Sequence, residues 1–118
     1  MCSRLDLSKE SNNGNIDFVN DFDYWWDSNG GRPYHSAPGS FQGFNVEWLK
    51  EVGGYDEFYI GWGSFDDDIK ERAIRSGLVP IWIDNFGVRL MHVYHNQRDY
   101  EFKTDFDRNY KHLEEKLK

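Results

Sequence analysis

Three consecutive aspartates are the residues whose type and spacing most directly suggest chemistry, Asp66, Asp67 and Asp68. Carboxylates of this kind can accept a proton as a general base or bind a divalent cation. The segment GWGSFDDD places Gly61 and Gly63 just ahead of them, and glycines let a backbone approach a ligand closely. Trp62, between these glycines, could form the wall of a pocket. A simpler interpretation, an acidic first turn stabilised by the helix dipole, stays open.

Two histidines, His92 and His95, follow in the segment MHVYH. Three positions apart at the end of a predicted strand, they point to opposite faces. We therefore expect one of them to face a site and the other to pack or hydrogen-bond locally. A carboxylate cluster with a histidine fits a divalent site of the Mn²⁺ kind, and the same residue types could also form a purely structural metal site.

The acids stand at the start of a predicted helix. Apolar residues recur at helical spacing through residues 69–74, and residues 64–66 offer N-cap candidates. We expect this helix to run to about Ser76, with Gly77 as a natural stop. The helix would then hold the three carboxylates in its first turn.

Two further helices are predicted on either side. The shorter one, VEWLKEV, is capped by Asn45 and ended by Gly53 and Gly54. The last helix follows Thr104, which together with Asp107 resembles a capping box. Its apolar stripe comprises Phe106, Tyr110, Leu113 and Leu117.

Strands are few in this pattern. Residues 78–83 and 88–95 predict two strands separated by a turn at 84–87, and residues 40–44 predict a short strand or an extended entry. Residues 1–38 are irregular or loop-rich. Such a sheet is incomplete by itself, so we expect another chain or a further part of the protein to complete it. A homo-oligomer is one way to do so.

Composition excludes several classes of protein. The chain has 118 residues with a net charge of −7 and no basic stripe, which argues against nucleic-acid binding. Its single cysteine, Cys2, excludes an internal disulfide and a cysteine-rich zinc site. There is no apolar run of membrane-spanning length and no secretory signal, so we expect no membrane segment and a cytoplasmic location.

Aromatic residues are unusually abundant. They make up 18% of the chain and include five tryptophans. Large rings can simply fill the core of a small domain, or they can stack on the C–H faces of sugars. An exposed cluster of rings would favour sugar binding.

Several segments, in order, resemble the C-terminal half of A-type-fold glycosyltransferases. The likeness spans Gly39 to His95 and is carried by FQGFNVEWLKEVGGYDEFYIGWG, then FDDDIKERAIRSGL, then LMHVYH. Over this range the chain is similar to β-1,4-galactosyltransferases and to the large inverting bacterial family. The resemblance implies an α/β, partial A-type fold in which residues 1–118 form one domain with few strands and about three helices. It also implies a nucleotide-sugar donor, a UDP-sugar above all, a glycan acceptor, and Mn²⁺ or Mg²⁺.

Individual roles follow from the same resemblance. Asp66 matches the catalytic base, which takes the proton of the acceptor hydroxyl, and Asp68 matches a second acid that orients the acceptor or the loop. His95 matches the metal ligand. The loop that lines the donor and acceptor pocket corresponds to Gly61, Trp62 and Gly63, and Asp67 belongs to the same pocket.

The chain also departs from that pattern. Phe65 occupies the place of an acid ahead of the base, and Ser64 replaces a glycine. The first change could alter acceptor choice, or the register could slip by one so that Asp67 is the base. The Asp-x-Asp motif of the nucleotide-binding half is missing, and Asp21 and Asp23 are interpreted as a chance match to it.

Two functions therefore compete. The first is an inverting glycosyltransferase fragment that lacks most of the nucleotide site and shows little or no activity alone. The second is a non-catalytic carbohydrate-binding or degenerate transferase module, which the replacement by Phe65 favours.

Overall fold

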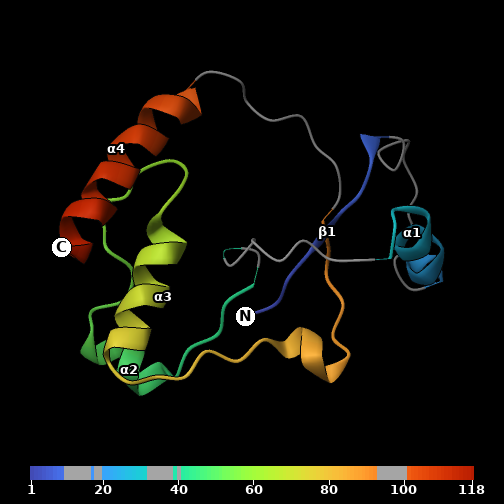
Figure 1. Cartoon of the computed structure of the whole chain (residues 1–118), viewed down its shortest axis with the longest axis horizontal. Coiled ribbons are helices and arrows are strands. Elements are labelled where there is room, and N and C mark those ends of the chain that lie inside the picture. The colour runs from blue at the N-terminus through green and yellow to red at the C-terminus, as the bar shows by residue number, and fades with distance from the viewer. Residues whose placement is uncertain (10–16, 18–19, 32–38, 40, 93–100) are drawn as a thin grey trace. The chain divides into compact units, whose positions relative to one another are not determined.

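The computed structural model describes residues 1–9, 17, 20–31, 39, 41–92 and 101–118, except the side chains of 101–103. The chain divides into two compact units, each of which is described by itself. The first unit comprises Met1–Gln42 with Ile81–Gln97, and the second comprises Gly43–Pro80 with Arg98–Lys118. Within the described residues the chain is a small mixed structure of helices and a short sheet, compatible with part of an α/β glycosyltransferase domain (Figure 1).

The first unit is built around a short parallel sheet. Strand β1 (Leu5–Asp6) pairs with β2 (Met91–His92) in a register that places Leu5 opposite Met91. Leu5, on β1, and Leu7, just after it, are buried. The strand predicted at 88–95 is therefore confirmed only at 91–92, and residues 93–95 lie outside the described part of the chain.

The prediction of a strand at residues 78–83 is wrong. Residues 78–82 belong to no strand, and the chain passes into a 3-10 helix at Ile83–Phe86. Pro80 has no N–H to donate, and the pairing that does occur involves only Met1, which donates to the Ile81 carbonyl and accepts from Ile83 N–H. The turn predicted at 84–87 is confirmed, and Gly87 ends it with φ of 79°.

Helix α1 (Phe22–Ser28) also belongs to the first unit, within the range predicted to be loop-rich. Trp26 is buried, and Arg89 stacks over its ring and that of Phe22. Arg89 also pairs with Asp23 at 2.7 Å. Asp23, one of the two aspartates of the chance Asp-x-Asp match, thus forms an ion pair with Arg89.

Helix α2 (Val46–Glu51) opens the second unit as predicted. The Asn45 side chain accepts hydrogen bonds from Glu47 N–H and Trp48 N–H. At the other end, Gly53 and Gly54 both have positive φ and return hydrogen bonds to the last turn. Local sequence alone thus sets both ends of this helix.

Helix α3 (Phe65–Arg75) agrees with the predicted helix. Gly77 ends it with φ of 87°, donating to the Ile74 carbonyl, while Leu78 N–H donates to the Ala73 carbonyl. Ser64 stands at the N-cap with φ of 69°, but its side chain makes no capping hydrogen bond. Ser64 takes part in the first turn through its carbonyl oxygen, which accepts from Asp68 N–H at 2.9 Å.

The core of the second unit lies between α2 and α3. It contains Trp48, Ile69 and Ala73, and the residues packed against it are Phe44, Leu49 and Val52. This core holds α3, and with it the three acids, against the preceding helix.

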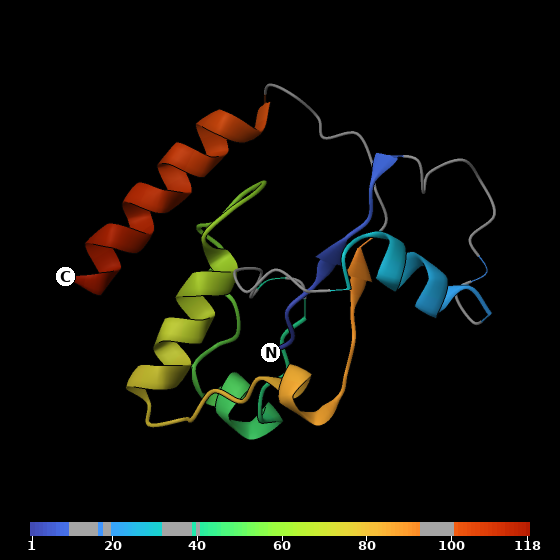
Figure 2. The same cartoon turned by 45° about the vertical axis from the view of Figure 1, so that its right-hand side comes forward.

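Helix α4 (Glu101–Leu117) runs beside α3 in both views (Figures 1 and 2). It begins earlier than predicted, so Thr104 is an interior residue and the capping box does not exist. Of the predicted apolar stripe only Leu113 is buried, whereas Phe106, Tyr110 and Leu117 are exposed. The buried face instead includes Asn109, a polar residue.

No helix among the described residues combines the length and apolar character that a membrane span requires.

Candidate functional site

The three acids at the start of α3 have different surroundings. Asp68 is only 2% exposed, and its carboxylate accepts from Arg72 Nε at 2.9 Å and from Lys116 Nζ at 2.6 Å. Burying a carboxylate is costly unless cations and hydrogen bonds compensate for the lost water, and here both do. Asp68 therefore acts in this structure as a link from α3 to α4.

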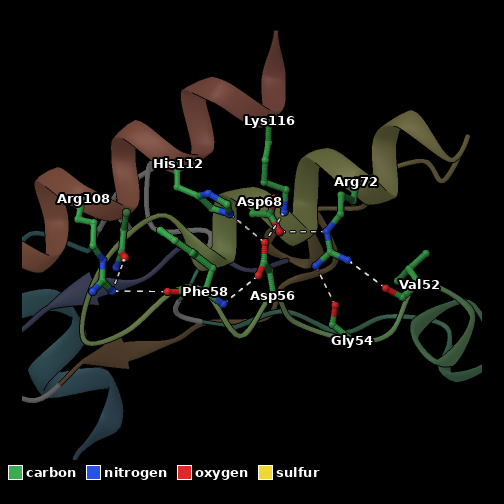
Figure 3. A network of polar contacts seen from close by, with 10 residues as sticks. Val52, Gly54, Asp56, Phe58, Asp68, Arg72, Arg108, His112 and Lys116 are labelled. Atoms are coloured by element: carbon green, nitrogen blue, oxygen red, sulfur yellow. Dashed lines mark hydrogen bonds and ion pairs between the residues drawn. The ribbon is translucent and has the colours of Figure 1, made fainter.

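Asp56 is the second acid of this network, and sequence reasoning missed it. Its carboxylate accepts from Lys116 Nζ at 2.8 Å and from Phe58 N–H at 2.9 Å, and Nε2 of His112 lies 3.0 Å away (Figure 3). Hydrogen bonds from Lys116, then from Phe58 N–H and His112, hold the pKa of Asp56 far below its usual range.

Lys116 joins the two acids. Burial alone would lower its pKa, but hydrogen bonds to Asp56 and Asp68, together with their negative charges, raise the pKa overall. Burial also raises the pKa of the Tyr59 hydroxyl, and the charges of the same two acids add to that shift. The polar network therefore favours a cationic lysine and a neutral tyrosine.

Arg72 extends the network to the end of α2. Its guanidinium donates to the carbonyl oxygens of Gly54 at 2.8 Å and Val52 at 3.3 Å while it pairs with Asp68 (Figure 3). These carbonyls belong to the helix end that Gly53 and Gly54 turn. One arginine thus ties α2, α3 and the buried acid together.

The other two acids are more accessible. Asp67 pairs with Lys70, one turn further along α3, at 2.9 Å. Asp66 is partly exposed and lies near Tyr55, whose pKa is raised first by burial and then by the negative charge of Asp66. Of the three predicted site acids, these two offer the more accessible carboxylates.

The predicted Gly61–Gly63 loop lies against α4. Gly61 and Gly63 have φ of 74° and 96°, and Asn109, on α4, is fully buried. Nδ2 of Asn109 donates to the carbonyl oxygens of Ile60, Trp62 and Gly63. The position of the loop therefore depends on a helix far along the chain.

Three aromatic rings form a row beside this loop. Trp62 is 56% exposed, and its ring lies 5.5 Å from that of Phe106, which in turn stacks on Tyr110 at 6.1 Å. Tyr110 is 48% exposed. Adjacent exposed rings from a loop and a helix favour sugar binding over simple core packing.

The predicted metal ligand cannot be placed, because His95 lies outside the described residues. His92, on β2, has Nδ1 3.1 Å from the carboxylate of Asp6, its partner on the paired strand β1. Within the ranges that the structure describes, no group of three or more His, Cys, Asp or Glu side chains is arranged to hold a metal ion.

A periodic polar stripe could have revealed the residues that were missed. Asn109, His112 and Lys116 recur at intervals of three and four along α4, and all of them contact the loop or the acids. Apolar periodicity does not reveal them, because all three side chains are polar. Asp56 also carried a local sequence signal, because aspartate favours turns. In the structure its carboxylate accepts from the N–H of Phe58, two residues further along.

Comparison with known proteins identifies the family. Residues 27–112 match the family described as the N-terminal domain of galactosyltransferase. This match covers most of the chain and contains the loop, all three acids and most of α4. The chain therefore belongs to this galactosyltransferase family.

The same comparison found no match among curated proteins or among solved structures.

Proposed function

We propose that this chain is the acceptor-side part of an inverting glycosyltransferase that moves a sugar from a nucleotide-diphosphate donor, a UDP-sugar above all, to a glycan acceptor. The observation that carries the proposal is the family match, which spans residues 27–112 and so contains Gly61–Asp68. The family description names an N-terminal domain. Our assignment to the C-terminal half of an A-type fold therefore rests only on the order of the sequence motifs.

In the proposed reaction Asp66 is the general base. The acceptor hydroxyl oxygen attacks the anomeric carbon, its proton passes to the Asp66 carboxylate, and the bond to the nucleotide diphosphate breaks with inversion. Partial exposure at the start of α3 suits this role. Asp67, the other accessible acid, remains the alternative base if the register differs by one.

Asp68 takes a different part in this proposal. Its carboxylate is engaged by Arg72 and Lys116 in the interior, so we propose that it fixes the start of α3 and thereby orients Asp66. Such support matters for a catalytic group, because a small displacement of a reacting group lowers the reaction rate considerably.

The aromatic row supplies the proposed sugar contact. Trp62 and Tyr110 are both exposed and both contact the Phe106 ring, and a sugar can place its C–H faces against such rings. The acceptor is the natural occupant, because Trp62 lies four residues before Asp66 in the same loop-to-helix segment.

A divalent cation, Mn²⁺ or Mg²⁺, completes the proposal with His95 as a ligand. When bound, such an ion would neutralise charge on the leaving diphosphate. The ligands would have to include residues beyond the described ones, since no suitable group occurs among those.

A titration of the chain with Mn²⁺, with and without UDP, tests the donor side. Tryptophan fluorescence and thermal melting are followed, because a ligand that binds only the folded state raises the melting temperature. We expect Mn²⁺ to bind and UDP to tighten its binding. If neither binds, His95 is not a sufficient ligand in this chain, and the donor-side part of the proposal fails for it.

A carbohydrate-binding module without catalysis is the second candidate. The exposed aromatic row and the replacement by Phe65 both favour it. Substitution of Asp66→Asn in the full-length protein separates the two, because a pure binder keeps its sugar affinity and has no transfer to lose, whereas a transferase keeps affinity and loses turnover by about 10²-fold or more. Two further expectations stay predictions. One is that this chain alone transfers little or no sugar, and the other is that the protein is cytoplasmic.

A further inference from the structure

The backbone of the Gly61–Gly63 loop packs directly on α4. An ideal Cβ atom at Gly63 would lie 2.7 Å from the Phe106 ring, and one at Gly61 would overlap the Asp105 carboxylate. Both glycines also have positive φ, which side chains rarely tolerate. The loop therefore follows a path that strongly favours glycine, and it packs closely against α4 along that path.

Three carbonyl oxygens of this loop segment converge on the Asn109 side chain, which is 0% exposed. Its Nδ2 atom donates to the carbonyls of Ile60, Trp62 and Gly63 at 2.9, 3.1 and 3.2 Å. Its Oδ1 atom accepts from Arg108 at 3.3 Å. Because an amide nitrogen has two donor hydrogens, the three acceptors share them, and neither aspartate nor leucine could replace that donor.

We infer that Asn109 is a positioning residue that fixes the Gly61–Gly63 loop so that Trp62 is presented to a sugar in one orientation. This inference rests on the proposed function, which alone assigns the loop to a sugar pocket. Asn109 is too deeply buried to touch a substrate, so it acts through the loop. Holding a glycine-containing loop in its bound conformation removes the entropy cost of ordering it during binding.

The first test needs no sugar. Backbone order parameters are measured by NMR relaxation for the whole chain and for Asn109→Asp, which keeps the size but removes the donor. We expect values for the Gly61–Gly63 loop to fall from about 0.85 to below about 0.6, while α3 stays near about 0.85. Lys111→Gln, at an exposed position of the same helix, should change neither. An unchanged loop, or an equal loss in α3, overturns the inference.

The second test measures binding by tryptophan fluorescence, with glucose, galactose and N-acetylglucosamine as probes. Asn109→Asp should bind about tenfold more weakly than the original chain, and Asn109→Gln, which keeps an amide donor, should recover part of the loss. Equal affinity in Asn109→Asp overturns the presenting role. If the original chain binds no probe, the proposed sugar pocket fails, and the order parameters still decide whether Asn109 fixes the loop.

A third measurement applies if Asn109→Asp does not fold. In the original chain, the side-chain amide protons of Asn109 should exchange with water at least about tenfold more slowly than those of exposed Asn85, because they are buried and hydrogen-bonded. Equal rates would show that the hydrogen bonds to the loop do not persist in solution, and the inference would be wrong.

Discussion

Lys116 links two acids that come from different segments of the second unit. Its ammonium lies 2.8 Å from Asp56 and 2.6 Å from Asp68, while Arg72 provides the only other cation that the described structure places on Asp68. Without the Lys116 ammonium, the buried Asp68 carboxylate would have only Arg72 among the described residues to balance its charge.

Substitution of Lys116→Met should therefore lower the free energy of unfolding by about 2 kcal/mol, less than a fully buried pair would lose because the lysine keeps some solvent contact. Urea unfolding followed by circular dichroism measures this change. Lys111→Met, at an exposed position of the same helix, is the matched control and should change stability by less than about 0.5 kcal/mol. Equal effects would contradict a specific role for Lys116.

The lowered pKa of Asp56 predicts an acid-sensitive contribution to stability. Its unfolded pKa is about 3.9, and the folded pKa is lower, so the contribution is fully present above about pH 4 and is lost as pH falls below that. The stability difference between the original chain and Asp56→Asn should shrink as pH falls from about 6 to about 2.5. A difference that stays constant over that range would contradict the assignment.

Alkaline conditions should act on the same network in the opposite direction. The pKa of Lys116 is raised, so its contribution is present below its unfolded value of about 10.4 and is lost as pH rises through the folded value. The raised pKa of Tyr59 works in the same sense, because the unfolded tyrosine ionises first. Lys116→Met should reduce this alkaline loss, and an identical alkaline profile would count against the network.

At the scale of elements, glycine ends two helices of the second unit. Gly53 and Gly54 turn the end of α2, and Gly77 turns the end of α3. These ends aim the following segments, including the one that leads from α2 to the aromatic loop. The helix stops are consequently part of what positions the site.

Gly77→Ala tests how much that turn contributes. An added Cβ meets nothing within 4 Å, so the cost arises from φ of 87° alone and should be about 1–2 kcal/mol. Gly43→Ala is the matched control, because it too has open space around the Cβ position but no positive φ. Its stability should change by less than about 0.5 kcal/mol. If the two variants lose the same stability in urea unfolding, the conformational argument is wrong.

At the scale of the whole molecule, the sheet of the first unit is incomplete. Within the described residues it has two strands, and a sheet of that size has little stability of its own. Outer strand edges can pair with another chain.

Self-association through those edges is therefore expected. Size-exclusion chromatography with light scattering should give a mass above the 14.1 kDa of a single chain, and the mass should rise with protein concentration. A strict monomer at all concentrations would contradict this expectation and leave the sheet to be completed within the protein itself.

Sequence reasoning succeeded where the relevant interactions are local. The Asn45 cap and the glycine stops depend on residues within one or two turns, and both are read directly from the chain. The strand at residues 78–83 failed because strand formation requires a partner, and here the partner is little more than Met1. The start of the last helix failed because Thr104 imitates a cap that the fold does not use.

By itself, the sequence determined helices α2 and α3, the acidic start of α3, the loop of two glycines and a tryptophan, and the resemblance to galactosyltransferases that the family match supports. Only the tertiary structure decided that Asp68 is buried, that Trp62 stands in an exposed aromatic row, and that Asn109 holds its loop. The physical reason is distance along the chain. Asp56 and Lys116 are 60 residues apart, and Asn109 and Ile60 are 49 apart, so no local pattern specifies the partner that each side chain finds.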